Sequence, residues 1–430
     1  MNTLSFLKSD IIACNTIDPA LYDKFEVKRG LRNKDGSGVL AGLTRVCSVI
    51  GFHKVENELI PVDGDLKYRG ISIQVLVDKL LETKRCYFEQ ACFLLLLGRL
   101  PNKDELSVLC SFISQNRQIP QALIDHVLKG IPGKNVMNKL QGAVAALYGY
   151  DEDPENIAAF DDFERSIKLL AKMPLLIAYA YLASVKPDAR FLAPKPEMSI
   201  AESFLYVLNE GKEGSLSDVE MVDLCLVLHA EHGGGNNSTF AARVISSSAS
   251  DLYSTIVAAI ASLKGPLHGS ANKKVMDMMA DIKASVKHWD DEAEVIAYLE
   301  KIVKQEAHDR TGKIYGLGHA VYTKSDPRAV IIRSYAQALS KDKGREKEMK
   351  LYELIAKKGP EVFQSHKGSS KLIAPNVDFF SGFVYDCLGL PEELYTPMFA
   401  ISRTAGWCAH RIEEVACGKR IIRPAYKFVD

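Results

Sequence analysis

The sequence predicts a mainly α-helical protein. Apolar residues recur with helical spacing along almost the whole chain, and strand signals are confined to one short region. No alternation of strands with helices points to a parallel sheet. The two expected strands cover residues 46–54 and 58–68, and Asp63, Gly64 and Asp65 supply turn residues for a small hairpin region.

A buried helix is expected in the middle of the chain. Ser217 can cap its start, and Glu220 three residues later completes a capping box. Residues 221–228 are apolar nearly all round, which indicates burial, and the glycines at 233–235 end the helix. Residues 254–263 form a second, mostly apolar helix.

The C-terminal part continues the helical pattern. Residues 340–349 are polar and suggest a solvated loop. The longest helix is expected over residues 393–418, where Arg403 and His410 lie off the apolar stripe, on the side where side chains ordinarily face solvent. The stripe recurs at alternating steps of four and three residues and consists of Leu394, Met398, Ile401, Ala405, Cys408, Ile412 and Val415.

Composition excludes several classes of function. The 54 Lys and Arg residues balance 54 Asp and Glu residues, which argues against non-specific binding to nucleic acid or to an anionic membrane. No stretch approaches the roughly 18 apolar residues that a membrane span requires, and no secretory signal is visible. The nine cysteines include no Cys-x-x-Cys pair. We therefore expect buried, reduced thiols in a cytoplasmic protein.

Two histidines close the buried helix. His229 and His232 are three residues apart and share one helical face. A metal site would need a third ligand, and no His-Glu-x-x-His pattern is near, so we expect no metal here. A helix C-terminus favours charged imidazole, so anion binding is the better hypothesis.

Two further histidines are framed by glycines. His268 follows Gly265 and should lie just ahead of a helix N-terminus, where the positive end of the dipole favours a neutral, hydrogen-bonding imidazole. His319 follows Gly316 and Gly318. A dinucleotide-binding loop would need a preceding strand and a third glycine, and both are missing.

Two charged residues begin expected helices. Asp326 and Pro327 are typical of an N-cap and a first helical position, so Arg328 falls in the first turn, where a cation is locally unfavourable. Arg328 is therefore either an anion ligand or a solvated surface residue. Asp378 lies beside Phe379 at the start of another helix, where the dipole keeps it ionised and apolar neighbours raise its basicity. A simple helix cap is the alternative.

Taken together, these blocks resemble the citrate synthase family. They read His229-Ala-Glu-His232, Gly-Pro-Leu-His268-Gly, Gly-Leu-Gly-His319-Ala-Val-Tyr with Asp-Pro-Arg328, and Pro-Asn-Val-Asp378-Phe-Phe-Ser-Gly, in the family's order and spacing. Supporting matches are Asp65-Leu-Lys-Tyr-Arg-Gly70, Leu94 to Pro101, Arg403-Thr-Ala-Gly-Trp407 and Arg423-Pro424. The resemblance covers roughly residues 35–426.

The resemblance implies a mainly helical, two-domain homodimer with its active site in a cleft. A large domain would comprise residues 1–269 and 386–430, and a small domain residues 270–385. It also implies the reaction, which is condensation of acetyl-CoA with oxaloacetate followed by hydrolysis of the thioester to give citrate and CoA. The CoA thioester is then a co-substrate, and no permanently bound cofactor is expected.

Roles for individual residues follow from the same resemblance. Asp378 would take a proton from the thioester methyl group, His268 would donate a hydrogen bond to the thioester carbonyl, and His319 would hydrogen-bond the ketone of oxaloacetate. Residues that would hold the oxaloacetate carboxylates are His232, Arg328, Arg403 and, from the other subunit, Arg423. The chemistry agrees, because bidentate guanidinium groups suit a dianion and a neutral donor suits a developing enolate.

Some positions depart from the family pattern. Gly233 stands where many members carry Glu, and Thr323 where members often carry a basic residue facing CoA. Lys324 can replace that basic residue, and Lys371 aligns with another CoA-facing lysine. Two alternatives stay open: a 2-methylcitrate synthase that uses propionyl-CoA, and a catalytically silent paralogue that acts as a binding or assembly protein. One methylene changes discrimination by only about 1–3 kcal/mol.

Overall fold

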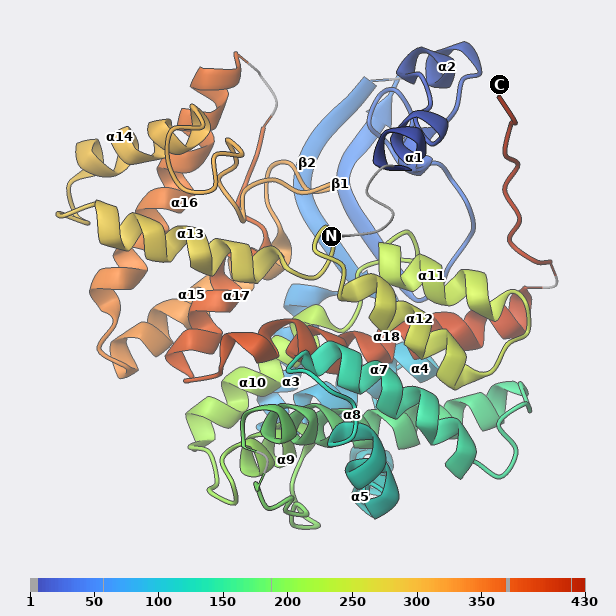
Figure 1. Ribbon diagram of the computed structural model, residues 1–430. Coiled ribbons are helices and arrows are strands. Elements are labelled where there is room, and N and C mark those ends of the chain that lie inside the picture. Colours follow the sequence, from blue (N-terminus) through green and yellow to red (C-terminus); the bar gives the residue numbers. More distant parts are fainter. Residues whose placement is uncertain (1–6, 57, 187, 369–371, 419, 430) are drawn as a thin grey trace. The chain divides into compact units, whose positions relative to one another are not determined.

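A computed structural model describes residues 7–56, 58–186, 188–368, 372–418 and 420–429 (Figure 1). The chain divides into two compact units, one made of residues 1–43 and 54–59 and the other of residues 44–53 and 60–430. In its described part, the first unit contains the short helices α1 (Lys8–Cys14) and α2 (Pro19–Lys24) and the 3-10 turn η2 (Arg29–Leu31). Every described residue that the sequence predicts to be catalytic or substrate-binding lies in the second unit.

A small sheet forms where the strand signals predicted it. Strands β1 (Cys47–Val55), β2 (Glu58–Tyr68) and β3 (Ile71–Ser72) lie in that order, and β2 pairs antiparallel with β3. The predicted turn at residues 63–65 is wrong, because these residues lie inside β2.

Two glycines in the strands allow close packing of a neighbouring loop. Gly64 is required in β2 because a Cβ there would lie 2.2 Å from the carbonyl oxygen of Ser325. Gly51 in β1 likewise would bring a Cβ to 2.4 Å from the carbonyl oxygen of Val321. These glycines let the loop that carries His319 lie directly on the strands.

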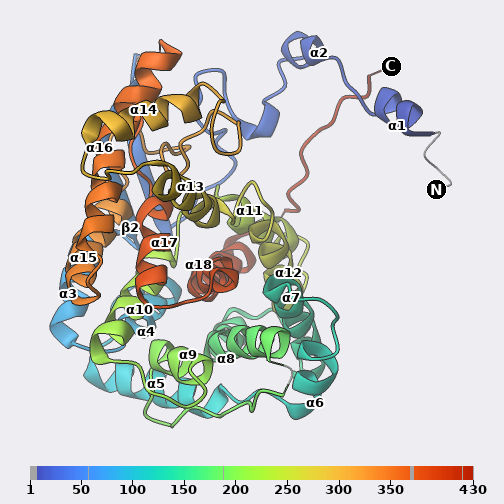
Figure 2. The ribbon, with the colours of Figure 1, turned by 60° about the vertical axis from the view of Figure 1, so that its left-hand side comes forward.

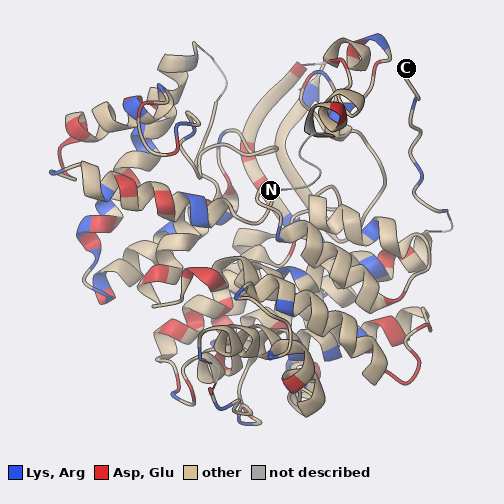
Figure 3. Ribbon diagram, viewed as in Figure 1, with Lys and Arg blue, Asp and Glu red and all other residues tan. Residues whose placement is uncertain are grey.

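Most of the remaining described chain is helical, so the mainly α fold class is confirmed (Figure 1). The helical elements are α3 (Ile73–Thr83), α4 (Tyr87–Leu97), α5 (Lys103–Asn116), α6 (Gln121–Leu123), the π-helical η3 (Ile124–Leu128), α7 (Val136–Leu147), η4 (Tyr148–Tyr150), α8 (Ala159–Val185), α9 (Ile200–Leu208), α10 (Leu216–His229), α11 (Asn237–Ser246), α12 (Leu252–Leu263), α13 (Ala271–Ser285), α14 (Glu292–Val303), α15 (Pro327–Asp342), α16 (Glu346–Lys367), α17 (Val377–Cys387), η5 (Glu392–Leu394) and α18 (Tyr395–Cys417). Acidic and basic residues are interspersed along them (Figure 3).

Helix α18 is the central helix of the second unit. It packs against α4, α8, α10, α11 and α12, and Figure 2 shows it surrounded by other helices. Almost every residue from Tyr395 to Arg411 is buried. The expectation of a solvent-facing side is therefore wrong, since Arg403 and His410 are both 0% exposed. An apolar stripe describes a helix with one covered face, whereas α18 is enclosed all round.

Helix α8 is also a core helix. Among the described residues it is the one helix long and apolar enough to cross a membrane by length and composition, with a mean hydropathy of 1.4 over its most apolar window. This is closer to a membrane span than the sequence analysis expected. However, 78% of that window is buried inside the fold. Packing against α7, α9 and α18 accounts for its apolar character.

Helix boundaries differ from expectation at two places. Helix α10 begins at Leu216, and its N-cap is Ser215 rather than Ser217, since the Ser215 hydroxyl accepts a hydrogen bond from the Asp218 amide. Residues 340–349 are not a loop, because α15 extends to Asp342 and α16 begins at Glu346. The many charged residues where α15 ends and α16 begins resemble the composition of a loop. Asp326 caps α15 with Pro327 in its first turn, as predicted.

Helices α13 to α17 pack mainly among themselves. Helix α17 contacts both α13 and α15, and α16 contacts α14 and α15. These helices cover most of the segment assigned to a small domain. The boundaries at residues 270 and 385 stay a prediction.

Gly51→Ala tests the close contact between the sheet and the loop. Overpacking of this kind should lower the free energy of unfolding by about 1–3 kcal/mol, measured by urea denaturation. The matched control is Gly149→Ala, since a Cβ at the exposed Gly149 would meet nothing within 4 Å and the change should stay within about 0.5 kcal/mol. Equal stability of the two variants would contradict the contact.

Candidate active site

The predicted site residues come from four separate parts of the chain. His232 follows the end of α10, and His268 lies in the turn between α12 and α13. His319 precedes α15, and Asp378 lies in the first turn of α17. Arg403 lies in the middle of α18, and its charge acts on His232, His268 and Asp378. The fold therefore brings His232, His268 and Asp378 within electrostatic range of one buried guanidinium, and His319 lies beside His232. Together these residues form the Arg403 cluster.

The histidines at the end of α10 are neutral in the structure. Nδ1 of His229 donates to the carbonyl of Cys225 at 2.9 Å, and burial lowers the pKa of His229 to about 3. Burial, followed by the charge of Arg328, also holds the pKa of His232 well below its ordinary value. The expected charged imidazole is thus wrong. Desolvation and a neighbouring cation outweigh the helix dipole, which is worth only about 0.3–2 kcal/mol.

The loop before α15 fixes the protonation of His319. Nδ1 of His319 accepts hydrogen bonds from the amides of Val321 at 3.0 Å and Tyr322 at 3.1 Å. The ring proton therefore resides on Nε2, which becomes a donor. The His319 ring stacks on Tyr322 with centroids 4.8 Å apart, and its centroid lies 5.0 Å from that of His232.

Asn376 joins this loop to the helix that carries Asp378. Its side-chain oxygen caps α17 by accepting from the Asp378 amide at 3.0 Å, and its side-chain nitrogen donates to the carbonyl of Gly318 at 2.8 Å. Its backbone amide donates to the carbonyl of Gly316 at 2.9 Å. Gly316 has φ 80°, and a Cβ there would meet the ring of Phe379 at 2.7 Å. The glycines that resembled a nucleotide loop thus serve to bring His319 close to α17.

Asp378 is a carboxyl group with raised basicity. Burial raises its pKa to about 6, against the opposing effect of the Arg328 charge. At neutral pH such a group is largely ionised but binds a proton more strongly than an ordinary Asp. This is the property that a general base needs.

Arg328 is held by a carboxylate of its own helix. Its guanidinium donates to both oxygens of Asp326, from Nε at 3.0 Å and from Nη2 at 2.7 Å. Asp326 also accepts from the amide of Val377 at 3.1 Å, so one carboxylate joins α15 to α17. The solvated alternative is wrong, since Arg328 is buried. The sequence indicated only the capping role of Asp326 and not its contacts with Arg328 and Val377.

Arg403 is the site residue whose missing hydrogen-bond partners most clearly indicate a bound ligand. Its Nε donates to the carbonyl of His229 at 2.8 Å, while Nη1 and Nη2 have no hydrogen-bond partner among the described residues. Arg411, on the same helix, also has two unpartnered nitrogens, but its Nε is paired with the carboxylate of Asp162 at 3.0 Å. Arg403 has no such direct pairing in the described chain. A buried guanidinium with two free donors suits a bidentate anion.

A buried network that the sequence analysis missed supports this arrangement. Glu231 accepts from Nε2 of His410 at 2.9 Å, and Nδ1 of His410 lies 2.7 Å from Nη2 of Arg243. Glu231 also accepts from the amide of Gly233, which fixes the turn after His232. Its carboxylate lies so close to α18 that a Cβ on Gly406 would be 2.0 Å from it. In the sequence, the feature that indicated this network was Glu231, which lies between His229 and His232.

His268 contacts the central helix through one serine. Its Nε2 lies 3.1 Å from the hydroxyl and 3.4 Å from the amide of Ser238, and that hydroxyl accepts from Nε1 of Trp407 at 3.1 Å. An amide can only donate, so Nε2 is assigned as the acceptor and Nδ1 carries the proton. Burial lowers the pKa of His268 to about 4, which agrees with the expected neutral form.

Comparison with known proteins places this arrangement in a family. A family profile described as citrate synthase, C-terminal domain, matches residues 35–425. The chain belongs to the citrate synthase family. It is 36% identical to citrate synthase 2 of Bacillus subtilis over 90% of this chain and 93% of that protein. It is 33% identical to 2-methylcitrate synthase 1 of Corynebacterium glutamicum over 94% of this chain and 96% of that protein.

Solved structures of the citrate synthase family share the fold. Citrate synthase of Pyrobaculum aerophilum gives a TM-score of 0.75 at 31% identity, covering 92% of this chain and 91% of that one. The structure of citrate synthase of Thermoplasma acidophilum, a ternary complex with carboxymethyl coenzyme A and oxaloacetate, gives a TM-score of 0.76 at 28% identity, covering 94% of this chain and 96% of that one. The citrate-synthase-like fold is therefore confirmed.

The remaining predicted residues of this citrate synthase family member are exposed or lie outside the described chain. Lys324 and Arg423 are exposed, and Arg423 lies in the C-terminal segment after α18. Lys371 lies outside the described residues. Within the described ranges, no group of three or more His, Cys, Asp or Glu side chains is arranged to hold a metal ion, and the absence of a metal stays a prediction.

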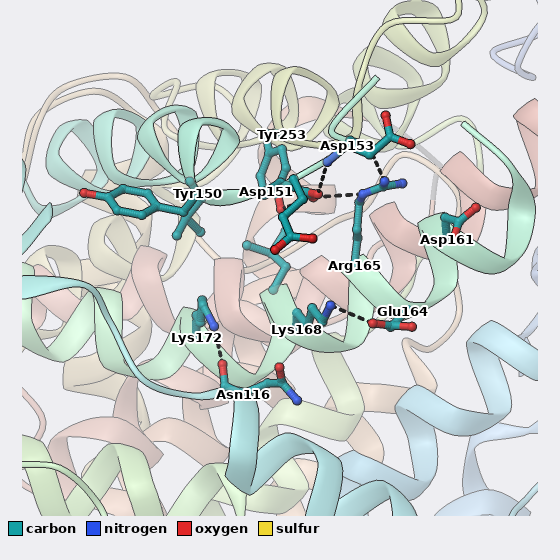
Figure 4. A pocket seen from close by; sticks show the side chains of 13 residues that line it. Asn116, Tyr150, Asp151, Asp153, Asp161, Glu164, Arg165, Lys168, Lys172 and Tyr253 are labelled. Atoms are coloured by element: carbon teal, nitrogen blue, oxygen red, sulfur yellow. Dashed lines mark hydrogen bonds and ion pairs between the residues drawn. The ribbon is translucent and has the colours of Figure 1, made fainter. Parts of the chain in front are cut away.

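A separate pocket of about 460 Å³ lies between α8 and the ends of α5 and α7 (Figure 4). None of the predicted site residues lines it. Its lining includes two ion pairs: Arg165 pairs with Asp151 at 2.8 Å, and Lys168 pairs with Glu164 at 2.6 Å. This pocket is therefore separate from the predicted site residues.

Asp378→Asn should stabilise the protein at neutral pH. The folded-state pKa of about 6 lies above the ordinary value of 3.8, so the folded protein binds this proton more tightly than the unfolded chain does. The carboxylate then costs stability in full above pH 6, and the cost disappears below about pH 4. The variant should gain about 1–3 kcal/mol at pH 7.5 and much less at pH 4, measured by urea denaturation.

The exposed Asp188 supplies the control for this prediction. Asp188→Asn should leave stability unchanged at both pH values. A loss of stability in Asp378→Asn at pH 7.5 would show that the carboxylate is favourably solvated or paired.

Proposed function

We propose that this chain is a citrate synthase, an acyltransferase that condenses acetyl-CoA with oxaloacetate and hydrolyses the thioester to give citrate and CoA. The observation that carries the proposal is the convergence of a basic carboxylate, neutral histidines and the partly unpaired Arg403 in one cluster. Relatives named citrate synthase over nearly the whole chain support it, as does the ternary complex of the Thermoplasma acidophilum enzyme.

The first step is removal of a proton from the acetyl methyl group. Asp378 is the base, because its raised pKa increases proton affinity while leaving it ionised at neutral pH. Nδ1 of His268 donates a hydrogen bond to the thioester oxygen as negative charge develops there. A neutral imidazole with a pKa of about 4 suits this role, because a charged one would surrender its proton outright.

The second step is attack of the enol carbon on the ketone of oxaloacetate. Nε2 of His319 is the donor to the ketone oxygen, since Nδ1 is occupied by two backbone amides. Arg403 offers Nη1 and Nη2 to a carboxylate, and Arg328 and His232 complete the oxaloacetate pocket. The citryl thioester that forms is then hydrolysed, which releases CoA and citrate.

The proposal includes a homodimer in the cytoplasm. Arg423 is exposed in this chain and would reach the oxaloacetate pocket of the other subunit. Lys324 and Lys371 would contact CoA, and no permanently bound cofactor, nucleic acid or membrane is required.

A 2-methylcitrate synthase is the second candidate. The relative from Corynebacterium glutamicum is named 2-methylcitrate synthase 1, and a relative from Bacillus subtilis at 36% identity is named citrate/2-methylcitrate synthase. The two acyl groups differ by one methylene, which a pocket distinguishes by only about 1–3 kcal/mol.

Thiol release from acetyl-CoA and from propionyl-CoA, each with and without oxaloacetate, tests the proposal. Release should depend strictly on oxaloacetate, and kcat/KM should be higher for acetyl-CoA. Asp378→Asn should lower kcat by about 10²–10⁴-fold, whereas Asp188→Asn should not change it. A higher kcat/KM for propionyl-CoA would favour the second candidate, and no release from either thioester would favour a silent paralogue.

A further inference from the structure

Two cysteine sulfurs lie in contact at the start of α4. Cys86 is the residue that precedes α4 and is buried, while Cys110 lies in α5 and is partly exposed. The sulfur atoms are 3.8 Å apart. A disulfide needs about 2.05 Å, so a small movement of two side chains would bring them to bonding distance.

The surroundings shift the pKa values of the two thiols in opposite directions. The hydrogen bond between the two sulfur atoms, together with the charges of Arg85 and Arg117, lowers the pKa of Cys110 against the effects of its partial burial and of the Glu89 charge. The same hydrogen bond and burial raise the pKa of Cys86. Arg117 donates to the hydroxyl of Ser203 and the carbonyl of Met198, neither of which is anionic. Cys110 is therefore the more acidic thiol of the pair and the more exposed one.

We propose that Cys86 and Cys110 form an oxidisable dithiol that a hydroperoxide converts into an intramolecular disulfide. The site is independent of the proposed enzymatic function, since neither cysteine belongs to the Arg403 cluster.

The chemistry balances with a hydroperoxide as the sole oxidant. The Cys110 thiolate attacks the peroxide, the O–O bond breaks, and a sulfenic acid forms as alkoxide or hydroxide leaves; the leaving group then takes a proton from solvent, the one that Cys110 lost on ionising, and becomes an alcohol or water. The Cys86 sulfur then attacks the sulfenic sulfur, an S–S bond forms, and hydroxide leaves and takes the Cys86 proton to become water. Two thiols are oxidised by two electrons, and one peroxide is reduced.

Tryptic mapping of the full-length protein after treatment with hydrogen peroxide tests the proposal. Cleavage after Arg85, Arg99, Lys103 and Arg117 gives one peptide with Cys86 and Cys92 and another with Cys110. The expected product is these two peptides joined, with the mass of two hydrogens lost, and dithiothreitol should separate them. Fragmentation of the joined peptide distinguishes Cys86 from Cys92 without any substitution.

Variants provide matched controls. Cys86→Ser and Cys110→Ser should both lose the joined peptide, and Cys92→Ser should keep it, although Cys92 is also buried in α4. Sulfinic or sulfonic acid at Cys110 without a joined peptide would overturn the proposal. A bond from Cys110 to Cys92 would overturn it as well.

Discussion

The buried guanidinium of Arg403 is the constraint on which the site depends. It lies on the enclosed helix α18, donates to the carbonyl that ends α10, and leaves two nitrogens without partners in the described chain. Burying such a charge is costly unless an anion completes its hydrogen bonds. Glu231 is the opposite charge that acts most strongly on it, yet it leaves those two donors unused. The fold thus keeps a cation ready for a ligand.

The rest of the site is preorganised by short connections between distant segments. Asp326 caps α15, holds Arg328 and accepts from the first residue of α17. Asn376 caps α17 and fastens the glycine loop that carries His319. Each of these two side chains caps a helix and also hydrogen-bonds a second, distant segment of the chain. Such fixed donors stabilise developing charge without reorganisation during the reaction.

The sequence was most informative where chemistry depends on local pattern. The helix cap at Asp326, the position of His268 before α13 and the mainly α class all follow from short-range rules, whereas the cap of α17 is Asn376 rather than Asp378. Long-range burial did not follow from them. The environment of Arg403 and His410 depends on helices from across the chain packing around α18, which one-helix periodicity cannot reveal. The charge of His232 was misjudged for the same reason, since burial by distant segments and then the charges of Arg328 and Arg403 lower its pKa.

Calorimetric titration of oxaloacetate into Arg403→Met is the most direct test of this account. The native protein should bind oxaloacetate, and the variant should bind it at least about 100-fold more weakly because two charge-assisted hydrogen bonds are lost. Arg333→Met, at a side chain that is 49% exposed on α15, should bind like the native protein. Unchanged affinity in Arg403→Met would contradict the central role of this guanidinium.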